Sequence, residues 1–424
     1  MEQSVHIAAL DLGTSQIKAM VARKTEDGML SILASEQIDS ENCIRRGYVF
    51  NMEETTNKVS QLIARLNKKL DSPVEKIYVG VGGQSIHTEP HSITKEVPGG
   101  VVTQNLLDAI TEEARDFELD SFETLDVVSP EYYLDGQLES NPKGATCSMI
   151  EARFNLIVGR STLKGKLIPV IRKARQEVAK FLISPLATAE AVLTEREKEL
   201  GCALVEFGAG VTSVFVYKGG LLRYLATIPL GGDVITKDIR SLDILKSEAE
   251  AAKIHFSETE ENDRIKEAIE ARRDEILKNV IRQIEESGQS LSAGIIITGG
   301  GALLKELPET LREKSGKEVR LANAGKKLIS PAGDWGQDPA NSCVIGLLSL
   351  GTEECLKEKE APVAVAGETD MFGDPIINKP DKKGGKKDPK EDPGKKTRGS
   401  GLFGEIAKRV DKMTGTLFGD ENIE

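Results

Sequence analysis

The alternation of apolar and polar positions predicts an α/β chain. Apolar runs of strand length occupy residues 5–10, 17–22, 30–34 and 77–81. Between the last two, apolar residues recur at helical spacing and share one face: Val59, Leu62, Ile63, Leu66 and Leu70. Strands that alternate with helices are typical of an α/β domain, and we expect residues 1–83 to form the first part of one lobe.

This rhythm changes between residues 84 and 160. A polar stretch, read as a loop, precedes a predicted helix at 106–115 and predicted strands at 125–128 and 150–158. We interpret this region as a small α+β domain inserted into the first lobe. A helix is then predicted at 163–178, and residues 161–187 are expected to complete the lobe.

The opening pattern returns in the second half of the chain. Predicted strands at 202–207, 212–217 and 221–227 are again separated by tight, Gly-containing turns. This repetition predicts two related lobes that face each other across a cleft. We expect the second lobe to span residues 188–327 and residues 328–357 to return to the first lobe.

The composition changes again near the C-terminus. Residues 358–400 are rich in Pro, Gly, Lys and Asp, which predicts a disordered linker. Residues 401–419 regain a helical period, with Leu402, Phe403, Ile406, Val410, Met413 and Leu417 on one face and the cations Lys408, Arg409 and Lys412 beside it. Such a helix suits the interface of an anionic membrane. The alternative is a terminal helix that folds back onto the body.

Charge and cysteine usage narrow the class of protein. The net charge of −12 argues against a general nucleic-acid binder, which carries a basic surface. The five cysteines are scattered without metal-site spacing, which is typical of a reducing compartment. There is no apparent secretory signal, and no apolar run approaches the roughly 20 residues that span a bilayer. We therefore expect a cytosolic protein with peripheral membrane contact.

Two turns carry the chemistry of phosphate binding. The first contains Asp11, Gly13, Thr14 and Ser15, with Lys18 shortly after it, and the second contains Glu206, Gly208, Ala209, Gly210 and Thr212. Each has an acid at a strand end, small residues that let phosphate approach the backbone, and a hydroxyl. Asp11 and Glu206 are candidates to hold Mg²⁺ through water. The alternative is two unrelated hairpins.

A third glycine-rich junction follows a hydrophobic strand. Residues 295–298 are apolar apart from Thr298, and Gly299, Gly300 and Gly301 come next, ahead of a predicted helix. A backbone without side chains can lie against a planar base or an α-phosphate near a helix N-terminus. The junction could also be a bare crossover.

In these motifs the sequence resembles the actin, heat-shock chaperone and sugar-kinase ATPases and, among them, the FtsA family of bacterial division proteins. The matching segments are 11–18, 204–212 and 295–302, together with 249–253, which resembles the A-E-x-x-K helix. The resemblance implies ATP and Mg²⁺ as ligands, with Glu250 and Lys253 at the ribose and base. Residues 78–84 and 129–137 resemble the boundary and interior of the domain inserted in that family.

The resemblance therefore implies a two-lobed actin-like ATPase fold with an inserted α+β domain, a disordered linker and a C-terminal amphipathic helix. It further implies a membrane-tethered protein at the cytoplasmic face of the bacterial inner membrane. Such a protein polymerises into filaments, anchors the FtsZ ring during cell division and contacts other divisome proteins. The C-terminal peptide of FtsZ is expected near residues 274–286, and nucleic acid is not an expected partner.

Two departures from the family pattern bear on activity. The family usually has Asp at the position of Glu206 and often has Gly at the position of Ala209. We therefore expect at most a slow ATPase. The segment 253–272 is also shorter than in typical relatives. Two alternatives remain open. One is a small-molecule kinase of the sugar-kinase type, but the sequence shows no apparent aspartate to act as its base. The other is a pilus-assembly relative, but such a protein would not be expected to carry the predicted terminal helix.

Overall fold

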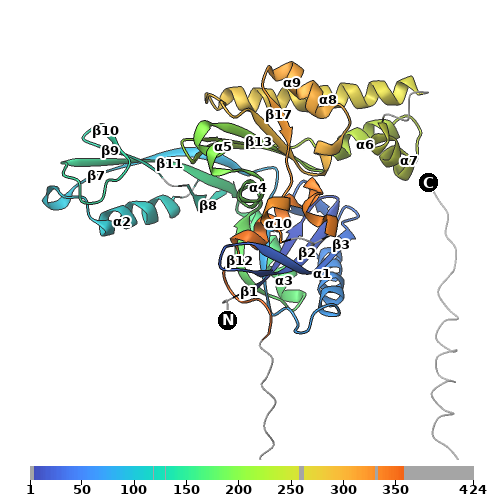
Figure 1. Ribbon diagram of the computed structural model, residues 1–424, viewed down its shortest axis with the longest axis horizontal. Coiled ribbons are helices and arrows are strands. Elements are labelled where there is room, and N and C mark those ends of the chain that lie inside the picture. Colours follow the sequence, from blue (N-terminus) through green and yellow to red (C-terminus); the bar gives the residue numbers. More distant parts are fainter. Residues whose placement is uncertain (1–3, 118, 129, 257–261, 330–332, 358–424) are drawn as a thin grey trace, which may run out of the picture. The chain divides into compact units, whose positions relative to one another are not determined.

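The first of three large sheets is built around the N-terminal strand. The computed structural model describes residues 4–117, 119–128, 130–256, 262–329 and 333–357 (Figure 1). The strand order is β12-β6-β1-β2-β3. The strands are β1 (Val5–Leu12), β2 (Gln16–Lys24), β3 (Leu30–Asp39), β6 (Lys76–Val81) and β12 (Glu177–Ile183). The first three form an antiparallel meander, and β6 and β12 extend the sheet in parallel.

The second sheet repeats this arrangement with the order β15-β14-β13-β16-β17. Its strands are β13 (Cys202–Phe207), β14 (Thr212–Lys218), β15 (Leu221–Ile228), β16 (Ile295–Thr298) and β17 (Val319–Leu321). Again three antiparallel strands are followed by two parallel ones. The predicted α/β fold with two related lobes is confirmed.

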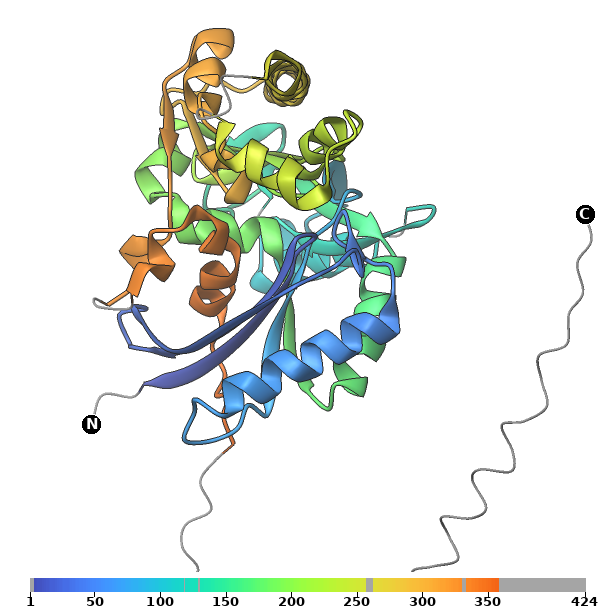
Figure 2. The same cartoon turned by 90° about the vertical axis from the view of Figure 1, so that its right-hand side faces the viewer.

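Helices cover both faces of the first sheet. The helices are α1 (Met52–Asn67), α3 (Thr162–Lys173), α4 (Ser184–Val192) and α10 (Ser342–Leu350). α1 packs on β2, β3 and α3, whereas α10 packs on β1, β2, β6 and α4. Figure 2 shows α1, in blue, and α10, in orange, on opposite sides of the blue strands. Although α10 follows the second sheet in the sequence, it thus completes the core of the first sheet.

The second sheet also faces two cores. Along β13, Leu204 joins the core shared with the first sheet, while Ala203 and Val205 point into a separate core. That second core is closed by α6 (Gly232–Arg240), α7 (Lys246–Ile254), α8 (Asp263–Glu286) and α9 (Leu307–Ser315). Because β13 is buried on both faces, its sequence is apolar almost throughout.

The inserted region has a sheet and a core of its own (Figure 1, left). It comprises β7 (His87–Glu96), α2 (Gln104–Arg115), β8 (Phe122–Val127), β9 (Glu131–Leu134), β10 (Gln137–Glu139) and β11 (Met149–Arg160). The polar stretch that we expected to be a loop is largely β7, which pairs with β11 along its length. Its alternate side chains face solvent, so a strand here needs few apolar residues.

The insert also contacts the second sheet. The Thr88 hydroxyl accepts a hydrogen bond from the Leu225 backbone N–H at 2.9 Å, and the Asn155 side chain donates to the Leu222 carbonyl oxygen at 3.2 Å. Arg223 forms an ion pair with Glu131 at 2.9 Å. The insert is therefore joined to β15 by side-chain hydrogen bonds as well as to the first lobe by the chain.

The helix predicted at 163–178 is shorter in the structure than expected. α3 ends at Lys173, and Arg175 adopts a left-handed conformation (φ +60°) that reverses the chain. The apolar residues after it belong to β12, an edge strand parallel to β6. A short apolar run next to a helix fits either element, and here sheet pairing decides between them.

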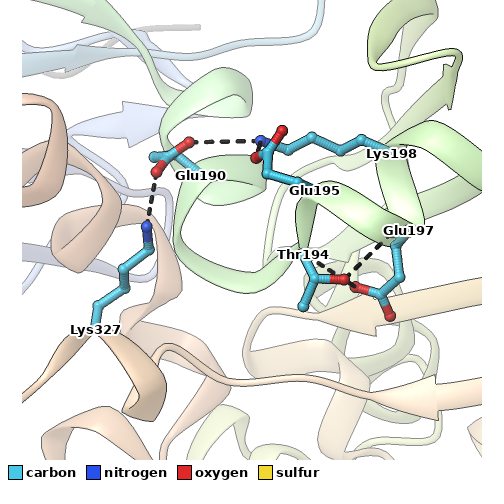
Figure 3. A network of polar contacts seen from close by, with 6 residues as sticks. All are labelled: Glu190, Thr194, Glu195, Glu197, Lys198 and Lys327. Atoms are coloured by element: carbon cyan, nitrogen blue, oxygen red, sulfur yellow. Dashed lines mark hydrogen bonds and ion pairs between the residues drawn. The ribbon is translucent and has the colours of Figure 1, made fainter.

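Polar contacts tie together the two connections between the large sheets. The first connection contains α4 and α5 (Glu195–Leu200), and the second contains η4 (Gly325–Lys327). Glu190 on α4 binds Lys327 at 2.7 Å and Lys198 at 3.5 Å (Figure 3). Arg320 in β17 pairs with both carboxylate oxygens of Glu197, at 2.7 and 2.9 Å. The two connections are held as one assembly.

The predicted linker and terminal helix lie outside the described residues. All five cysteines lie inside them and are buried free thiols. Among the helices that the structure describes, none is long and apolar enough to cross a bilayer.

A test of the core concerns Gly346, where α10 crosses α4. A Cβ there would lie 1.8 Å from the Ala187 carbonyl oxygen, so Gly346→Ala must push the two helices apart. We expect a loss of about 1–3 kcal/mol in the free energy of unfolding, measured by chemical denaturation. The matched control is Gly165→Ala in α3, where a Cβ meets nothing within 4 Å. That change should stabilise by about 0.5–1 kcal/mol, and equal effects of the two changes would contradict the packing argument.

Candidate functional site

The two predicted phosphate turns have the same geometry. Residues 13–16 lie between the paired residues Leu12 and Ile17, and residues 208–211 lie between the paired residues Phe207 and Thr212 at the same point of the repeat. A Cβ on Gly13 would lie 2.6 Å from the carbonyl oxygen three residues later, and a Cβ on Gly208 would lie 2.9 Å from its equivalent. Any side chain would collide with the turn itself, so both positions require glycine. This shared requirement for glycine explains why the phosphate-turn motif can be recognised twice in the sequence.

The two turns also touch each other. A Cβ on Gly210 would lie 2.5 Å from Thr14 Oγ1 and 2.9 Å from its Cγ2, so the Thr14 side chain rests directly on the Gly210 backbone. Thr14 Oγ1 also accepts a hydrogen bond from the Gly47 N–H at 3.3 Å. Ser15 is exposed at the tip of the first turn, and Ala209 lies next to Gly210 in the second. A ligand held by one turn therefore lies beside the other.

Asp11 and Glu206, the candidate magnesium neighbours, approach each other from the two lobes. Burial and, second to it, the nearby Asp11 carboxylate raise the pKa of Glu206 to about 8, although a hydrogen bond from Thr188 Oγ1 at 3.2 Å acts in the opposite direction. Burial also raises the pKa of Asp11, which Lys18 opposes. Two acids held this close repel each other when both are ionised. A cation between the two carboxylates would relieve this repulsion.

The donor set fits a cation held through water better than one held directly. In the described ranges no group of three Asp, Glu, His or Cys side chains is placed to hold a metal ion. Two carboxylates that share one cation through water are typical of Mg²⁺, which keeps several of its own waters. Asp11 and Glu206 would supply charge and outer hydrogen bonds to such a hydrated ion.

Two predicted site residues are engaged elsewhere. Lys18 is buried, and its ammonium group donates to the Ala340 carbonyl at 2.7 Å and to Asn341 Oδ1 at 2.9 Å. Burial lowers its pKa. The Thr212 hydroxyl is fully buried and donates to the Leu230 carbonyl at 2.8 Å. In this conformation both residues fix the backbone behind the turns.

The third glycine junction packs against the second turn. Gly299 has φ +86°, and a Cβ on it would lie 2.5 Å from the Phe207 carbonyl oxygen. A Cβ on Gly301 would lie 3.0 Å from the same oxygen, while Gly300 begins a 3₁₀ turn, η3 (Gly300–Leu303). The predicted helix therefore does not follow at once, since α9 begins only at Leu307. The glycines serve close backbone packing.

The A-E-x-x-K segment, residues 249–253, is linked to the second turn through α6. Lys253 Nζ lies 2.8 Å from the Glu250 carboxylate and 3.0 Å from Thr236 Oγ1, and 3.4 Å from the Gly232 carbonyl oxygen. The Gly232 N–H in turn donates to the Gly208 carbonyl at 2.9 Å. Although burial raises the pKa of Glu250, its bonds with Lys253 and Thr236 outweigh this and lower it. The pair is preassembled next to the second turn.

Several residues of the site were missed from the sequence. Thr188 on α4 binds Glu206, which follows 18 residues later, and Asn341 binds Lys18 from a segment far away along the chain. The start of α6 was also missed, although Gly231 and Gly232 between a strand and an amphipathic helix are a recognisable signal. A Cβ on Gly231 would lie 2.5 Å from the Ala209 carbonyl oxygen, which explains that glycine.

Comparison with known families agrees with this arrangement. The family "Cell division protein FtsA" matches residues 203–346, and the "SHS2 domain inserted in FTSA" matches residues 83–158. Among solved structures, the PilM-PilN type IV pilus biogenesis complex contains a chain of similar fold. Its TM-score is 0.61 at 17% identity, over 82% of this chain and 99% of that one. The two-lobed, actin-like fold with an inserted domain is therefore confirmed.

Sequence relatives point to one family. The cell division protein FtsA of Porphyromonas gingivalis is 33% identical over 377 residues, which cover 82% of this chain and 78% of the relative. The FtsA proteins of Neisseria meningitidis and Escherichia coli are 28% and 26% identical and cover 82% of this chain and 90% and 91% of their own lengths. With this identity sustained over most of both chains, the protein belongs to the family of the cell division protein FtsA.

Proposed function

We propose that this protein is an ATP-binding actin homologue that polymerises and tethers the FtsZ ring to the cytoplasmic face of the cell membrane. The observation that carries the nucleotide part is the contact between Thr14 and Gly210. It brings two phosphate turns of equal geometry, one from each lobe, to a single place. The similarity to a pilus-assembly structure supports only the fold, while the family match favours cell division.

A nucleotide bound here would connect the lobes. Its phosphates would lie along the backbone of residues 13–15 and 208–210, with Mg²⁺ beside Asp11 and Glu206. Gly299, Gly300 and Gly301 and the Glu250–Lys253 pair are the candidates for the adenosine end. Because the two turns belong to different sheets, a ligand that binds both favours the closed arrangement of the lobes. Closure by ATP is the step that we expect to precede polymerisation.

Membrane attachment would come from residues 401–419, which lie outside the described residues. A single shallow amphipathic helix binds weakly and reversibly. A filament that carries many such helices gains affinity, since each further attachment is effectively intramolecular. The predicted FtsZ surface at residues 274–286 falls on α8 and remains a prediction.

The contact between the turns can be tested by Gly210→Ala. The new Cβ would collide with Thr14, separate the two turns and weaken ATP binding by about tenfold, a cost of roughly 1.4 kcal/mol. Titration calorimetry with Mg-ATP measures the affinity, with Gly165→Ala as a control that should bind like the wild type. Unchanged affinity in Gly210→Ala would show that the phosphates do not lie between the turns.

The second test follows the charge of Glu206. Its pKa is about 8 in the folded protein against 4.5 ordinarily, so the folded state holds the extra proton between these values. The free energy of unfolding of the Mg²⁺-free protein should therefore fall as pH rises from about 4.5 to about 8. In Glu206→Gln, the free energy of unfolding should lack the part of this decrease that comes from Glu206.

Denaturation midpoints from pH 5 to 9 provide the measurement. The control variant is Glu318→Gln, whose side chain is 92% exposed and should leave the wild-type profile unchanged. Mg²⁺ should reduce the wild-type fall and have little effect in Glu206→Gln. Identical profiles for wild type and Glu206→Gln would contradict the paired-carboxylate arrangement.

The third test separates tethering from the other functions. The full chain should sediment with anionic liposomes, more strongly with Mg-ATP, and a chain that ends at Lys396 should stay in the supernatant. A full-length Val410→Asp/Met413→Asp variant keeps the cations and should also stay soluble, because its apolar face is broken. Sedimentation of the shortened chain at wild-type levels would move the membrane contact elsewhere.

A further inference from the structure

The outer side of α3 carries cations and no acid. Residues 160–180 contain seven Lys or Arg side chains and a single acid, Glu177, in a chain whose net charge is −12. Two of the cations, Arg160 and Lys166, belong to the cleft beside the two turns. The surface discussed below, called the basic face, consists of Lys164, Ile168, Arg172, Lys173 and Arg175. Among the α-helices in the described ranges, α3 is the one that has cations without any acid.

The basic face is exposed and lacks counter-charges of its own. Arg172, Lys173 and Arg175 are exposed, and Lys164 is half-buried. Within the described ranges no carboxylate oxygen lies within 4 Å of these four cations, whereas Lys58 on the neighbouring helix α1 pairs with Glu41 at 2.7 Å. An anionic partner would therefore not have to displace internal ion pairs.

The stability of the helix does not account for these charges. Cations stabilise the last turn of a helix, where Arg172 and Lys173 lie, but they are unfavourable near its start. Lys164 nevertheless lies in the first turn of α3, which has no acid and no side-chain hydrogen bond at its N-cap. Pro169 inside the helix also removes one backbone hydrogen bond. The outer side thus has a composition that the helix itself does not require.

An apolar side chain lies between the cations. Lys164, Ile168 and Arg172 follow at intervals of four residues, so they share one side of α3. Ile168 is 41% exposed. The opposite side is buried and consists of Leu163, Leu167, Val170 and Ile171. Exposed apolar residues flanked by Lys and Arg suit the interface of an anionic membrane, where the cations lie at the headgroups.

The basic face ends beside the last residues that the structure describes. The Glu177 N–H, just after the turn that follows α3, donates to the Glu75 carbonyl oxygen at 3.3 Å. The Glu75 N–H donates in turn to the Cys355 carbonyl oxygen at 2.9 Å. Residues 358–424, which include the predicted membrane helix, follow directly after Lys357. The C-terminal end of α3 therefore lies close to the start of the predicted tether.

We propose that the basic face of α3 is a second membrane contact, carried by the folded body, for a surface of anionic phospholipid headgroups. It rests on the proposed attachment through residues 401–419, which brings the body to the membrane. The predicted linker of residues 358–400 would, as a flexible chain, have an end-to-end distance of roughly 35 Å. Arg172, Lys173 and Arg175 then contact lipid phosphates, and Ile168 contacts the apolar part of the interface.

This contact determines which side of the body faces the membrane. A tether on a flexible linker leaves the body free to rotate, whereas two contacts define one face. Once the tail is bound, the second contact forms within a single complex, so a contact that is weak by itself still adds to the affinity. The basic face alone is too weak to hold the shortened chain that ends at Lys396.

The first test compares the affinities of full chains for vesicles in the absence of nucleotide. Arg172→Gln/Lys173→Gln/Arg175→Gln should bind vesicles that contain phosphatidylglycerol more weakly than the wild type by about fivefold or more, since one cation near an anionic surface contributes up to about that factor. Its melting temperature should be unchanged, because the three side chains are exposed.

The matched control removes the same charge from another part of the surface. Arg264→Gln/Lys266→Gln/Lys305→Gln changes three exposed cations of the second lobe and should bind the vesicles like the wild type. Equal affinities of the two triple variants would contradict the inference.

A fluorescent label can locate the contact. All five native cysteines are buried, so a dye reacts selectively with Gly165→Cys on the outer side of α3, where a Cβ meets nothing within 4 Å. A dye that brightens in apolar surroundings should respond to the vesicles at this position. The same dye at Ala271→Cys, an exposed position of α8, should not respond. No response at position 165, or equal responses at the two positions, would refute the contact.

Arg175→Asn separates a lipid contact from a structural role. Arg175 adopts φ +60°, a conformation that Asn tolerates better than Arg. This variant should therefore melt at the wild-type temperature or above it while it binds the vesicles more weakly. A lower melting temperature together with unchanged binding would assign Arg175 to the fold.

The outcomes separate this inference from the proposed function. If the full chain does not bind the vesicles, the proposed tether is wrong. The shortened chain with a C-terminal polyhistidine tag, held on nickel-chelating vesicles, then tests the basic face alone. The dye at position 165 should brighten when these vesicles contain phosphatidylglycerol and stay dim when the other lipid is neutral. Equal signals refute the inference, and so does a dye that responds to polyglutamate but not to vesicles, which would indicate a protein-binding surface.

Discussion

The backbone carbonyls of the second turn are the constraint on which the site depends. The Phe207 carbonyl oxygen is crowded by Gly299 and Gly301, the Gly208 oxygen accepts from Gly232, and the Ala209 oxygen is approached by Gly231. The approaches of Gly299 and Gly231 are possible only because these residues lack a side chain, whereas a Cβ on Gly232 would lie 3.9 Å from the Gly208 oxygen. The third junction, the start of α6 and, through it, the Glu250–Lys253 pair are therefore positioned by one short piece of main chain.

This dependence explains what could be predicted from the sequence. Glycines that a backbone approach requires are visible at 13, 208 and 299, and the repeated strand pattern around them indicated two related lobes. Contacts made by ordinary side chains gave no such signal. Thr188 and Asn341 look like any polar helix residues until the fold brings them to Glu206 and Lys18.

Two of the differences from the predicted secondary structure have a related cause. β7 is polar because half of it faces solvent, and β12 is short and follows a helix, so neither has a pattern of its own. Both are defined by their partners, β11 and β6, which lie far away in the sequence. Local periodicity detects elements that bury a face by themselves, and it fails where pairing supplies the stability.

The contact between the insert and β15 has a consequence for solubility. β15 is the outer strand of the second sheet, and an outer strand offers unpaired N–H and C=O groups to any other extended chain. Thr88 and Asn155 occupy such groups of Leu225 and Leu222 with side chains, which cannot propagate a ladder. The inserted domain thus protects this edge against strand addition, and a version of this chain without it would leave the β15 edge exposed to pairing with other extended chains.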